Sequence, residues 1–505
     1  MSSLTEKTEK HDFKVEPANS SDASTDSRAV EEANGEVHGE WTVAEETAIR
    51  RKFDRTITPL VTVLYMCCAI DRANVGNAKI EGMATDLNLI GYRYNIVLSI
   101  FFIIYLSVEV PSNVLLKYFG PRYYMPFLVF SFGLVSLCTA FVKSYAGLAV
   151  TRAVLGIFEG GAMPATSFFL SCFYKKSELF FRMSIFIASS SLANSFGGLL
   201  ATALSKIPAW GASSAVIVSW RNIFFFEGLL TILLALAAVY FMPQGPGDWK
   251  FLSPRQRYIA AERIRREHDA HPQEKVTWHH VREAIFNVHT QVCAWCFFCT
   301  NSCVQGMGAF IPTILKEFGW TSTKAQLMSV PPYLVACCLT VALGYASDRT
   351  NRRGIFMLGA LVFSMTGFGI LRFSDDVHAK YGAVYLNAIG VFAASSGFLS
   401  WGINNTGSPA VAAVAGGYMV SVGSIGGVLS TWTYLGKDSP KFHMGHSINF
   451  ALQLFCFALA AIGLLHCKYE NKLRNEGKRD ARLEGLSEEE IRGLGHRHPQ
   501  FRYME

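Results

Sequence analysis

The sequence predicts an all-α membrane protein with twelve transmembrane helices in two six-helix bundles, and three observations carry this prediction. Hydrophobic residues make up 50% of the 505-residue chain, and its mean hydropathy is positive at +0.24. Charged residues make up only 17%, whereas soluble domains carry about 25%. Apolar runs of about 20 residues, the length that crosses a bilayer, stand on both sides of one polar interruption at 243–286.

Twelve apolar runs are long enough to be transmembrane helices. Six precede the polar interruption and six follow it, a division typical of two homologous bundles that enclose a path between them. The expected spans are 56–78, 94–117, 124–142, 146–169, 181–206, 218–242, 287–312, 326–346, 355–373, 381–401, 407–435 and 447–467.

The segments outside the bundles are polar. Residues 1–52 contain no apolar core, which excludes a secretory signal, and their composition predicts disorder. In the interruption, Ser253, Pro254 and Gln256 form a capping pattern that predicts a helix. Residues 277–286 resemble a helix at the membrane interface, but we favour a plain amphipathic connector. We expect a disordered cytosolic tail at 1–52, bundles at 53–242 and 287–467, a cytosolic central loop with short helices at 243–286, and a cytosolic tail at 468–505.

Basic residues indicate the orientation of the chain. The net charge of +7 does not indicate nucleic-acid binding, because the basic residues stand beside apolar spans. The short loops expected on the two sides of the membrane carry similar numbers of Lys and Arg. The orientation is therefore decided by the segments that flank the first and last spans and by the central loop. By the positive-inside rule we expect both termini in the cytosol. The deciding residues are Arg50, Arg51, Lys52, Arg55, Arg255, Arg257, Arg263, Arg265, Arg266, Lys468, Lys472 and Arg474.

One cysteine run has the spacing of iron–sulfur ligands and needs a separate explanation. Cys293, Cys296, Cys299 and Cys303 lie within an expected span, with aromatic neighbours, and Val304 replaces the usual proline. At this spacing the thiols line one helical face. We interpret them as small packing residues, so no metal or other cofactor is expected.

Ionisable residues within spans are costly and mark functional sites. Asp71 and Arg72 lie in the first span, and Arg152 and Glu159 lie two helical turns apart on one face of the fourth. In the same span, Gly156 and Gly160 form a small-xxx-small pair that allows close helix approach. Glu109 and Glu227 lie nearer span ends, so we interpret them as structural and leave their function open.

Several motifs together resemble the major facilitator superfamily, in particular its anion:cation symporter branch and the fungal allantoate, nicotinate and vitamin permeases. The resemblance covers residues 45–468. It is carried by the runs Arg51 to Asp54, Asp71 to Asn77, Glu109 to Asn113, Phe119 to Arg122, Arg152 to Gly161, Trp220 to Gly228 and Gly344 to Arg353. The segment 401–409 departs from the family, because it lacks the usual basic residues.

The resemblance implies roles for the four charged residues of spans one and four. Arg72 and Arg152 would bind an anionic substrate, because arginine stays charged and meets a carboxylate through two parallel hydrogen bonds. Asp71 and Glu159 would couple transport to protons, because a carboxyl beside an arginine responds to changes at that arginine. A gating network of salt bridges without substrate contact is the alternative.

The second bundle contributes polar and gating candidates. Asn301 and Gln305 are one helical turn apart, so they would contact the substrate or bond across helices. The loop signature after span eight includes Asp348, Arg349, Arg352 and Arg353. We expect these four residues to control the cytoplasmic gate.

The resemblance therefore predicts a proton-coupled transporter that takes up a small organic anion (nicotinate, allantoate, pantothenate or a similar carboxylate) across a fungal plasma membrane, as a monomer. No Gly-rich nucleotide loop is present, so an ion gradient must supply the work. An exporter of a secondary metabolite or organic acid, a non-transporting nutrient sensor and a membrane oxidoreductase are the alternatives.

Overall fold

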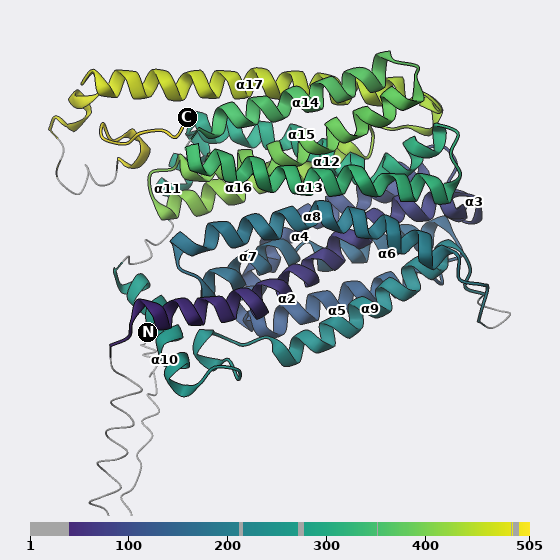
Figure 1. Cartoon of the computed structure of the whole chain (residues 1–505), viewed down its shortest axis with the longest axis horizontal. Coiled ribbons are helices and arrows are strands. Elements are labelled where there is room, and N and C mark those ends of the chain that lie inside the picture. The colour runs from purple at the N-terminus through teal and green to yellow at the C-terminus, as the bar shows by residue number, and fades with distance from the viewer. Residues whose placement is uncertain (1–39, 212–215, 271–276, 351, 486, 488–493) are drawn as a thin grey trace, which may run out of the picture.

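The computed structural model describes residues 40–211, 216–270, 277–350, 352–485, 487 and 494–505, and nearly all regular secondary structure in this part of the chain is helical. Within it the β-structure is limited to one isolated bridge between Trp210 and Ile217. Most of the expected N-terminal tail, 1–39, lies outside the described residues. Two layers of long helices lie against each other, the N-terminal half in one and the C-terminal half in the other (Figure 1).

The N-terminal half is built from helices that cover the first six expected spans. Their core includes buried apolar side chains of α2, α4, α5, α6, α7 and α9, and α5 packs along α9, α4 along α6 and α2 along α8. The elements are α2 (Val43–Ala78), η1 (Lys79–Met83), α3 (Ala84–Asp86), α4 (Arg93–Phe119), α5 (Pro121–Thr139), α6 (Tyr145–Glu159), α7 (Ala162–Phe173), α8 (Lys176–Ser205) and α9 (Trp220–Phe241).

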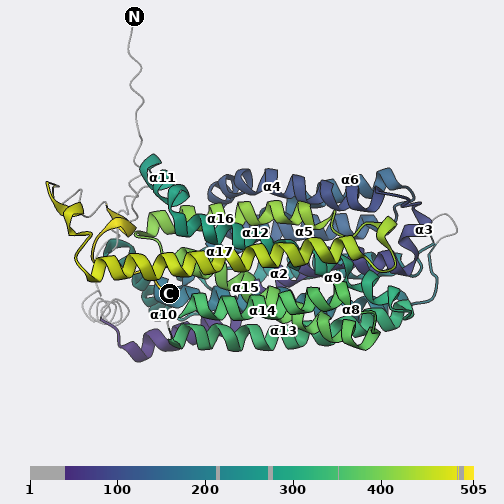
Figure 2. The same cartoon turned by 90° about the horizontal axis from the view of Figure 1, so that it is seen from above.

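The C-terminal half covers the other six expected spans. Here α14 packs along α15 and α17, and α12 along α16; α17 runs the length of this half (Figure 2). The elements of this half are α12 (Val288–Glu317), α13 (Ser322–Thr350), α14 (Arg353–Phe373), α15 (Val377–Asn404), α16 (Pro409–Ser430), η3 (Gly436–Asp438) and α17 (His443–Asn475), followed by η4 (Asp480–Leu483) and η5 (Gly495–Arg497). The central loop between the halves contains η2 (Pro246–Asp248), α10 (Pro254–Ala270) and α11 (Trp278–Phe286).

Each of the twelve expected spans lies on a helix, or on the pair α6 and α7. Within the described residues, eight helical segments are long and apolar enough to cross a membrane by length and composition alone. The first of them starts earlier than expected: α2 begins at Val43, after Thr42, whose side chain forms a capping box with Glu45. Residues 43–52, expected to be disordered, are therefore helical.

The central loop contains the expected short helices. Ser253 and Gln256 exchange backbone-to-side-chain hydrogen bonds of 3.3 Å at the start of α10, which confirms the capping prediction. The short helix expected at 277–286 is α11, where Trp278 and Phe286 are exposed.

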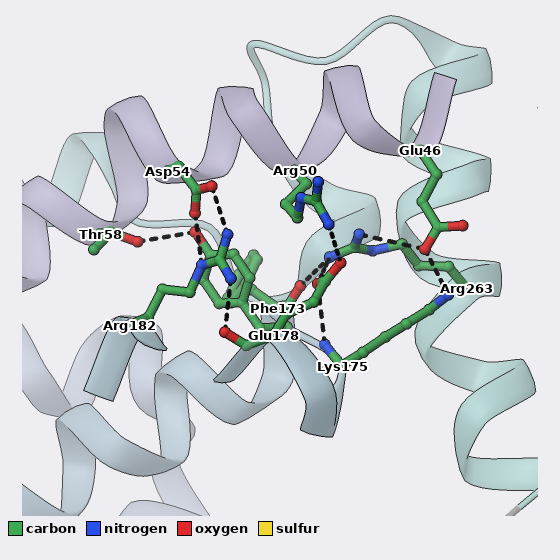
Figure 3. A network of polar contacts seen from close by, with 10 residues as sticks. Glu46, Arg50, Asp54, Thr58, Phe173, Lys175, Glu178, Arg182 and Arg263 are labelled. Atoms are coloured by element: carbon green, nitrogen blue, oxygen red, sulfur yellow. Dashed lines mark hydrogen bonds and ion pairs between the residues drawn. The ribbon is translucent and has the colours of Figure 1, made fainter. Parts of the chain in front are cut away.

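A network of charged side chains ties α10 to the N-terminal half (Figure 3). Arg263 of α10 is 1% exposed, donates to the carbonyl of Phe173 at 2.7 Å, and pairs with Glu178 of α8 at 3.3 Å. Glu178 also pairs with Arg50 of α2, and Asp54 of α2 binds Arg182 of α8 at 2.6 Å. This end of the N-terminal half is therefore held together by ion pairs.

Residues 494–505, which we call the C-terminal strap, fold back onto the C-terminal half. The backbone of Tyr503 donates to and accepts from the Asn471 side chain, at 2.9 Å in both directions. The backbone of Met504 makes the same exchange with Asn405, and its carbonyl accepts from Trp401. The strap therefore joins the ends of α15 and α17.

The cysteines of α12 lie in the core of the C-terminal half. Cys293, Cys296, Cys299 and Cys303 are all buried, and the Cys296 thiol lies 3.6 Å from the carbonyl of Cys456 on α17. Groups of His, Cys, Asp and Glu that could hold a metal ion are not found among the described residues.

The hydrogen bonds that join the two halves are concentrated at one end, which we call the closed end; it lies away from the described N- and C-terminal segments (Figure 1). Lys316 and Ser322 both donate to the carbonyl of Ile80, at 3.0 and 2.9 Å. Ser99 of α4 bonds Thr431 at 2.6 Å. A third contact joins Thr202 of α8 to Gln326 of α13 at 3.0 Å.

Candidate functional site

A cavity of about 140 Å³ lies between the two halves. Helices α2, α4, α6, α7 and α8 line it on one side, and α12, α13, α15 and α16 line it on the other. Four of the predicted substrate residues, Arg72, Arg152, Asn301 and Gln305, are among the lining residues. The structure therefore brings together side chains from three helices, α2, α6 and α12, that we expected to act together.

Arg72 forms an ion pair with Glu159 at the edge of this cavity. Its Nε atom donates to Glu159 Oε2 at 2.6 Å. The guanidinium also lies over the ring of Tyr105, at 4.9 Å from the centroid. Two polar atoms have no hydrogen-bond partner among the described residues, Nη2 of Arg72 and Oε1 of Glu159. The pair therefore leaves one donor and one acceptor of its own unused.

Glycines on α6 allow this geometry. A Cβ atom at Gly156 or at Gly160 would lie 2.7 Å from a backbone carbonyl oxygen of α4, so the expected close approach at this pair is confirmed. The fourth span, predicted as one helix, is interrupted after Glu159, and α7 starts at Ala162. The interruption falls on Gly160 and Gly161, which have no side chain to stabilise a continuous helix.

Asp71 points away from its neighbour Arg72. Its Oδ1 atom accepts a hydrogen bond of 2.9 Å from Ser136 on α5, and its Oδ2 atom is buried without a partner. Successive residues of a helix project about 100° apart, so one residue faces α5 while the next faces the cavity.

Arg152 lines the cavity without an ion pair within 4 Å among the described residues. It is 3% exposed, and its guanidinium lies 5.5 Å from the centre of the Phe224 ring. Its Nε atom has no hydrogen-bond partner. A buried cation in this state is available to an anion in the cavity.

The polar residues of α12 face the same cavity. Asn301 donates to the carbonyl of Gly423 on α16 at 2.8 Å, so it bonds across helices, and Gln305 also lines the cavity. Sequence reasoning missed Asn194 of α8 and the aromatic residues Tyr65, Phe101 and Phe297, which line the cavity as well. Asn194 could have been predicted from the sequence, because it is a polar residue within a span. The aromatic residues could not, because transmembrane spans contain many aromatic residues that do not line a cavity.

Two other buried acids within the predicted spans, Glu109 and Glu227, form no ion pair with Arg72 in the part of the chain that the structure describes. Glu227 of α9 accepts a hydrogen bond from Asn74 of α2. Glu109 of α4 is 6% exposed, and its Oε2 atom has no hydrogen-bond partner among the described residues. Neither lines the cavity.

The predicted gating residues lie where α13 ends and α14 begins. Arg353 is buried, and the Asn404 amide oxygen accepts from its guanidinium once the amide is oriented to satisfy both groups. Arg349 is exposed and donates to Tyr345 at 3.4 Å, and Arg352 is exposed at the start of α14. The side chain of Asp348 lies outside what the structure describes. Arg353 thus fastens this loop to the end of α15.

The sequence profile of the Major Facilitator Superfamily matches residues 61–431. The chain belongs to this superfamily. As a facilitator it is a membrane transporter and not an enzyme, and its all-helical architecture is the one expected from the sequence. The cavity accordingly lies where the two halves of a facilitator meet.

Fungal transporters are among the facilitator's relatives. An uncharacterised transporter of Schizosaccharomyces pombe is 33% identical over 433 residues, which cover 86% of this chain and 88% of that protein. The high-affinity nicotinic acid transporter of Saccharomyces cerevisiae is 31% identical, over 91% of this chain and 85% of that protein. An MFS-type transporter of Penicillium expansum is 31% identical over 95% of both chains.

Solved structures share the facilitator's fold. A bacterial homolog of the human lysosomal transporter Spinster, in an inward-facing and unoccupied conformation, has a TM-score of 0.64 at 14% identity, covering 84% of this chain and 97% of that one. A D-xylose-proton symporter has a TM-score of 0.61 at 13% identity, covering 81% of this chain and 97% of that one.

Proposed function

We propose that this facilitator carries a small organic anion, of the class of nicotinate, allantoate or pantothenate, together with protons. The observation that carries the proposal is the Arg72–Glu159 ion pair at the wall of the central cavity. If the Arg72 guanidinium releases the Glu159 carboxylate to bind a substrate carboxylate, substrate binding is linked to the charge of Glu159.

The exchange follows from the chemistry of the two groups. A substrate carboxylate would use two parallel N–H bonds of Arg72, and Nη2 is already without a partner. Glu159 is 0% exposed, so losing its cation would leave a buried, unpaired carboxylate, which is costly. Taking up a proton removes that cost. Substrate and proton would then travel together, with Asp71 as a second proton-binding group.

The walls of the cavity favour a small, partly apolar anion. Phe101, Tyr105 and Phe297 line it beside the polar residues Asn194 and Asn301. Aromatic faces pack against flat rings, and the amides can orient a polar substituent. The nicotinic acid transporter among the relatives supports an aromatic carboxylate as the first substrate to test.

We further propose that the protein works as a monomer in the plasma membrane, by alternating access, with both termini in the cytosol. The basic flanks of the first and last spans support this orientation. The closed end would then face outward, and the loop with Asp348, Arg349, Arg352 and Arg353 would lie at the cytosolic gate.

Uptake into cells tests the proposal. Cells that express the protein should accumulate labelled nicotinate, allantoate or pantothenate, and more at an outside pH of about 5 than at about 7, because the gradient supplies protons. Cells without the protein are the control, and the protein at the surface is quantified. If none of the three anions enters above background although the protein reaches the surface, the proposal is wrong; efflux from preloaded cells then tests the exporter alternative.

A further inference from the structure

A second cation, Lys79 at the start of η1, directly follows α2 and continues the helix face that carries Arg72. Lys79 follows Arg72 by seven residues, which is two helical turns, or about 10 Å along the axis. Val75 lies between them on that face and lines the cavity together with Arg72. From the cavity, this face of α2 therefore leads toward the closed end, where Lys79 stands.

At the closed end Lys79 is covered by aromatic rings. Its Nζ atom lies 4.2 Å from the centre of the Tyr94 ring and 5.6 Å from that of Phe310. No carboxylate lies within 4 Å of this atom among the residues that the structure describes, although Glu317 on α12 attracts it from farther away. Cation–π contacts thus stand in place of an ion pair.

One of the two rings that contact Lys79 belongs to the C-terminal half of the molecule. Phe310 is a residue of α12, and Tyr94 donates to the carbonyl of Ala309, also on α12, at 3.3 Å. The neighbouring carbonyl of Ile80 binds Lys316 and Ser322. When the two halves separate at this end, α12 leaves α2, and Lys79 loses Phe310 and faces the opening.

We propose that Lys79 is a subsite for the carboxylate of the transported anion, occupied when the closed end opens, from which the anion moves to Arg72. The proposal rests on the proposed function of Arg72 in anion transport. In the closed state the rings of Tyr94 and Phe310 take the place of the anion at the ammonium group. An organic anion that approaches from this end would meet Lys79 first and the guanidinium two turns deeper.

Initial rates of labelled nicotinate uptake test this role. Lys79→Gln should raise KM about tenfold, the effect of losing about 1.4 kcal/mol of binding, and leave the maximal rate within about twofold. Lys79→Arg should keep the wild-type KM, because it keeps the charge. Lys437→Gln is the matched control at the same end: Lys437 lies 6.0 Å from the Tyr92 ring and should not affect KM.

Ionic strength supplies a second readout that a packing role of Lys79 would not change. The wild-type KM should rise with salt, because salt screens the exposed ammonium group when the end is open, and the dependence should be weaker in Lys79→Gln. If Lys79→Gln reaches the cell surface and has the same KM as the wild type, the Lys79 subsite alone is overturned. The same conclusion follows if the KM of the wild type does not rise with salt. Absence of any anion uptake by the wild type overturns the subsite and the proposed function together.

Discussion

Arg72 joins the central cavity to a titratable carboxylate, so its shape should matter as well as its charge. Arg72→Lys should lower initial uptake at least about tenfold, because an ammonium cannot form two parallel bonds to a carboxylate. Uptake is measured at equal surface amounts of protein. Arg93→Lys is the control, since Arg93 is exposed, contacts the carbonyl of Asn88 and the ring of Tyr145, and does not line the cavity. Wild-type uptake by Arg72→Lys would contradict this role.

Gly76 allows the closest approach of α2 to α12. A Cβ atom there would lie 2.5 Å from the carbonyl oxygen of Ala309, so Gly76→Ala should hinder closure of this end and slow transport several-fold while the protein still folds. Initial uptake and the elution profile in detergent measure the two effects. Gly359→Ala should transport normally, because no atom lies within 4 Å of a Cβ built at Gly359.

The sequence predicted which charged residues lie within the spans, but it did not predict which way each side chain points. Arg72, Arg152 and Glu159 were expected in one site and lie around one cavity wall, because spacing along a helix fixes which residues share a face. Asp71 was expected beside Arg72 and instead faces Ser136. The sequence does not define how a helix is rotated against its neighbours, since apolar residues cover most faces of these spans.

Helix α10 is fastened to the N-terminal half by a buried arginine. Arg263→Ala should destabilise the protein by about 3 kcal/mol, the effect of removing a buried charged partner from an ion-pair network, and should raise hydrogen exchange in α10. Thermal unfolding in detergent and hydrogen exchange measure these effects. Arg265→Ala removes an exposed pair with Glu262, and pairs of this kind contribute below about 1 kcal/mol. Equal effects of the two substitutions would contradict the difference in burial.

The C-terminal strap should loosen in acid. Burial alone raises the pKa of Glu283 on α11, but the hydrogen bonds from His496 and the positive charges of His496 and His279 together outweigh burial and lower the pKa below its ordinary value of 4.5. A carboxyl with a lowered pKa stabilises the folded contact above its ordinary pKa, and this stabilisation is lost as the pH falls below it.

Hydrogen exchange of residues 494–505 measures this effect. Protection should be full near pH 7 and should fall below about pH 4.5, and Glu283→Gln should show lower protection at pH 7 with little further change in acid. Protection that is the same in the variant and the wild type at every pH would show that the pair does not hold the strap.

Helix positions were largely predictable, because apolar run length decides which segments cross a membrane. The early start of α2 was not predicted, although Thr42 and Glu45 carry a capping box, because the polar composition around them indicated disorder. The break after Glu159 was also missed, since glycines within spans are common and only the contact with α4 explains this one.

At the scale of the whole molecule, the two halves meet at one end through Ile80, Ser99 and Thr202 and their partners. Alternating access requires these bonds to break while the opposite end closes. A sequence cannot show which end is closed, because one sequence must support both arrangements at similar free energies. The cavity and its closed end therefore came from the structure, whereas the division into two halves was predicted.

Proteoliposomes can test whether a substrate carboxylate that replaces Glu159 at Arg72 couples transport to protons or only binds. When the transported anion is present on both sides of the membrane, the protein can exchange one anion for another without net proton movement. Accumulation of the anion against its concentration gradient requires net proton movement. Glu159→Gln should therefore keep exchange and lose pH-driven accumulation. Glu227→Gln is the matched control, because a glutamine oxygen can accept the same bond from Asn74.

The decisive measurement is the ratio of pH-driven accumulation to exchange in Glu159→Gln, compared with the wild type and Glu227→Gln. We predict a ratio near zero in Glu159→Gln and wild-type values in the other two. A Glu159→Gln protein that still accumulates the anion in response to the pH gradient would show that Glu159 does not carry the proton, and would contradict coupling through the Arg72 pair.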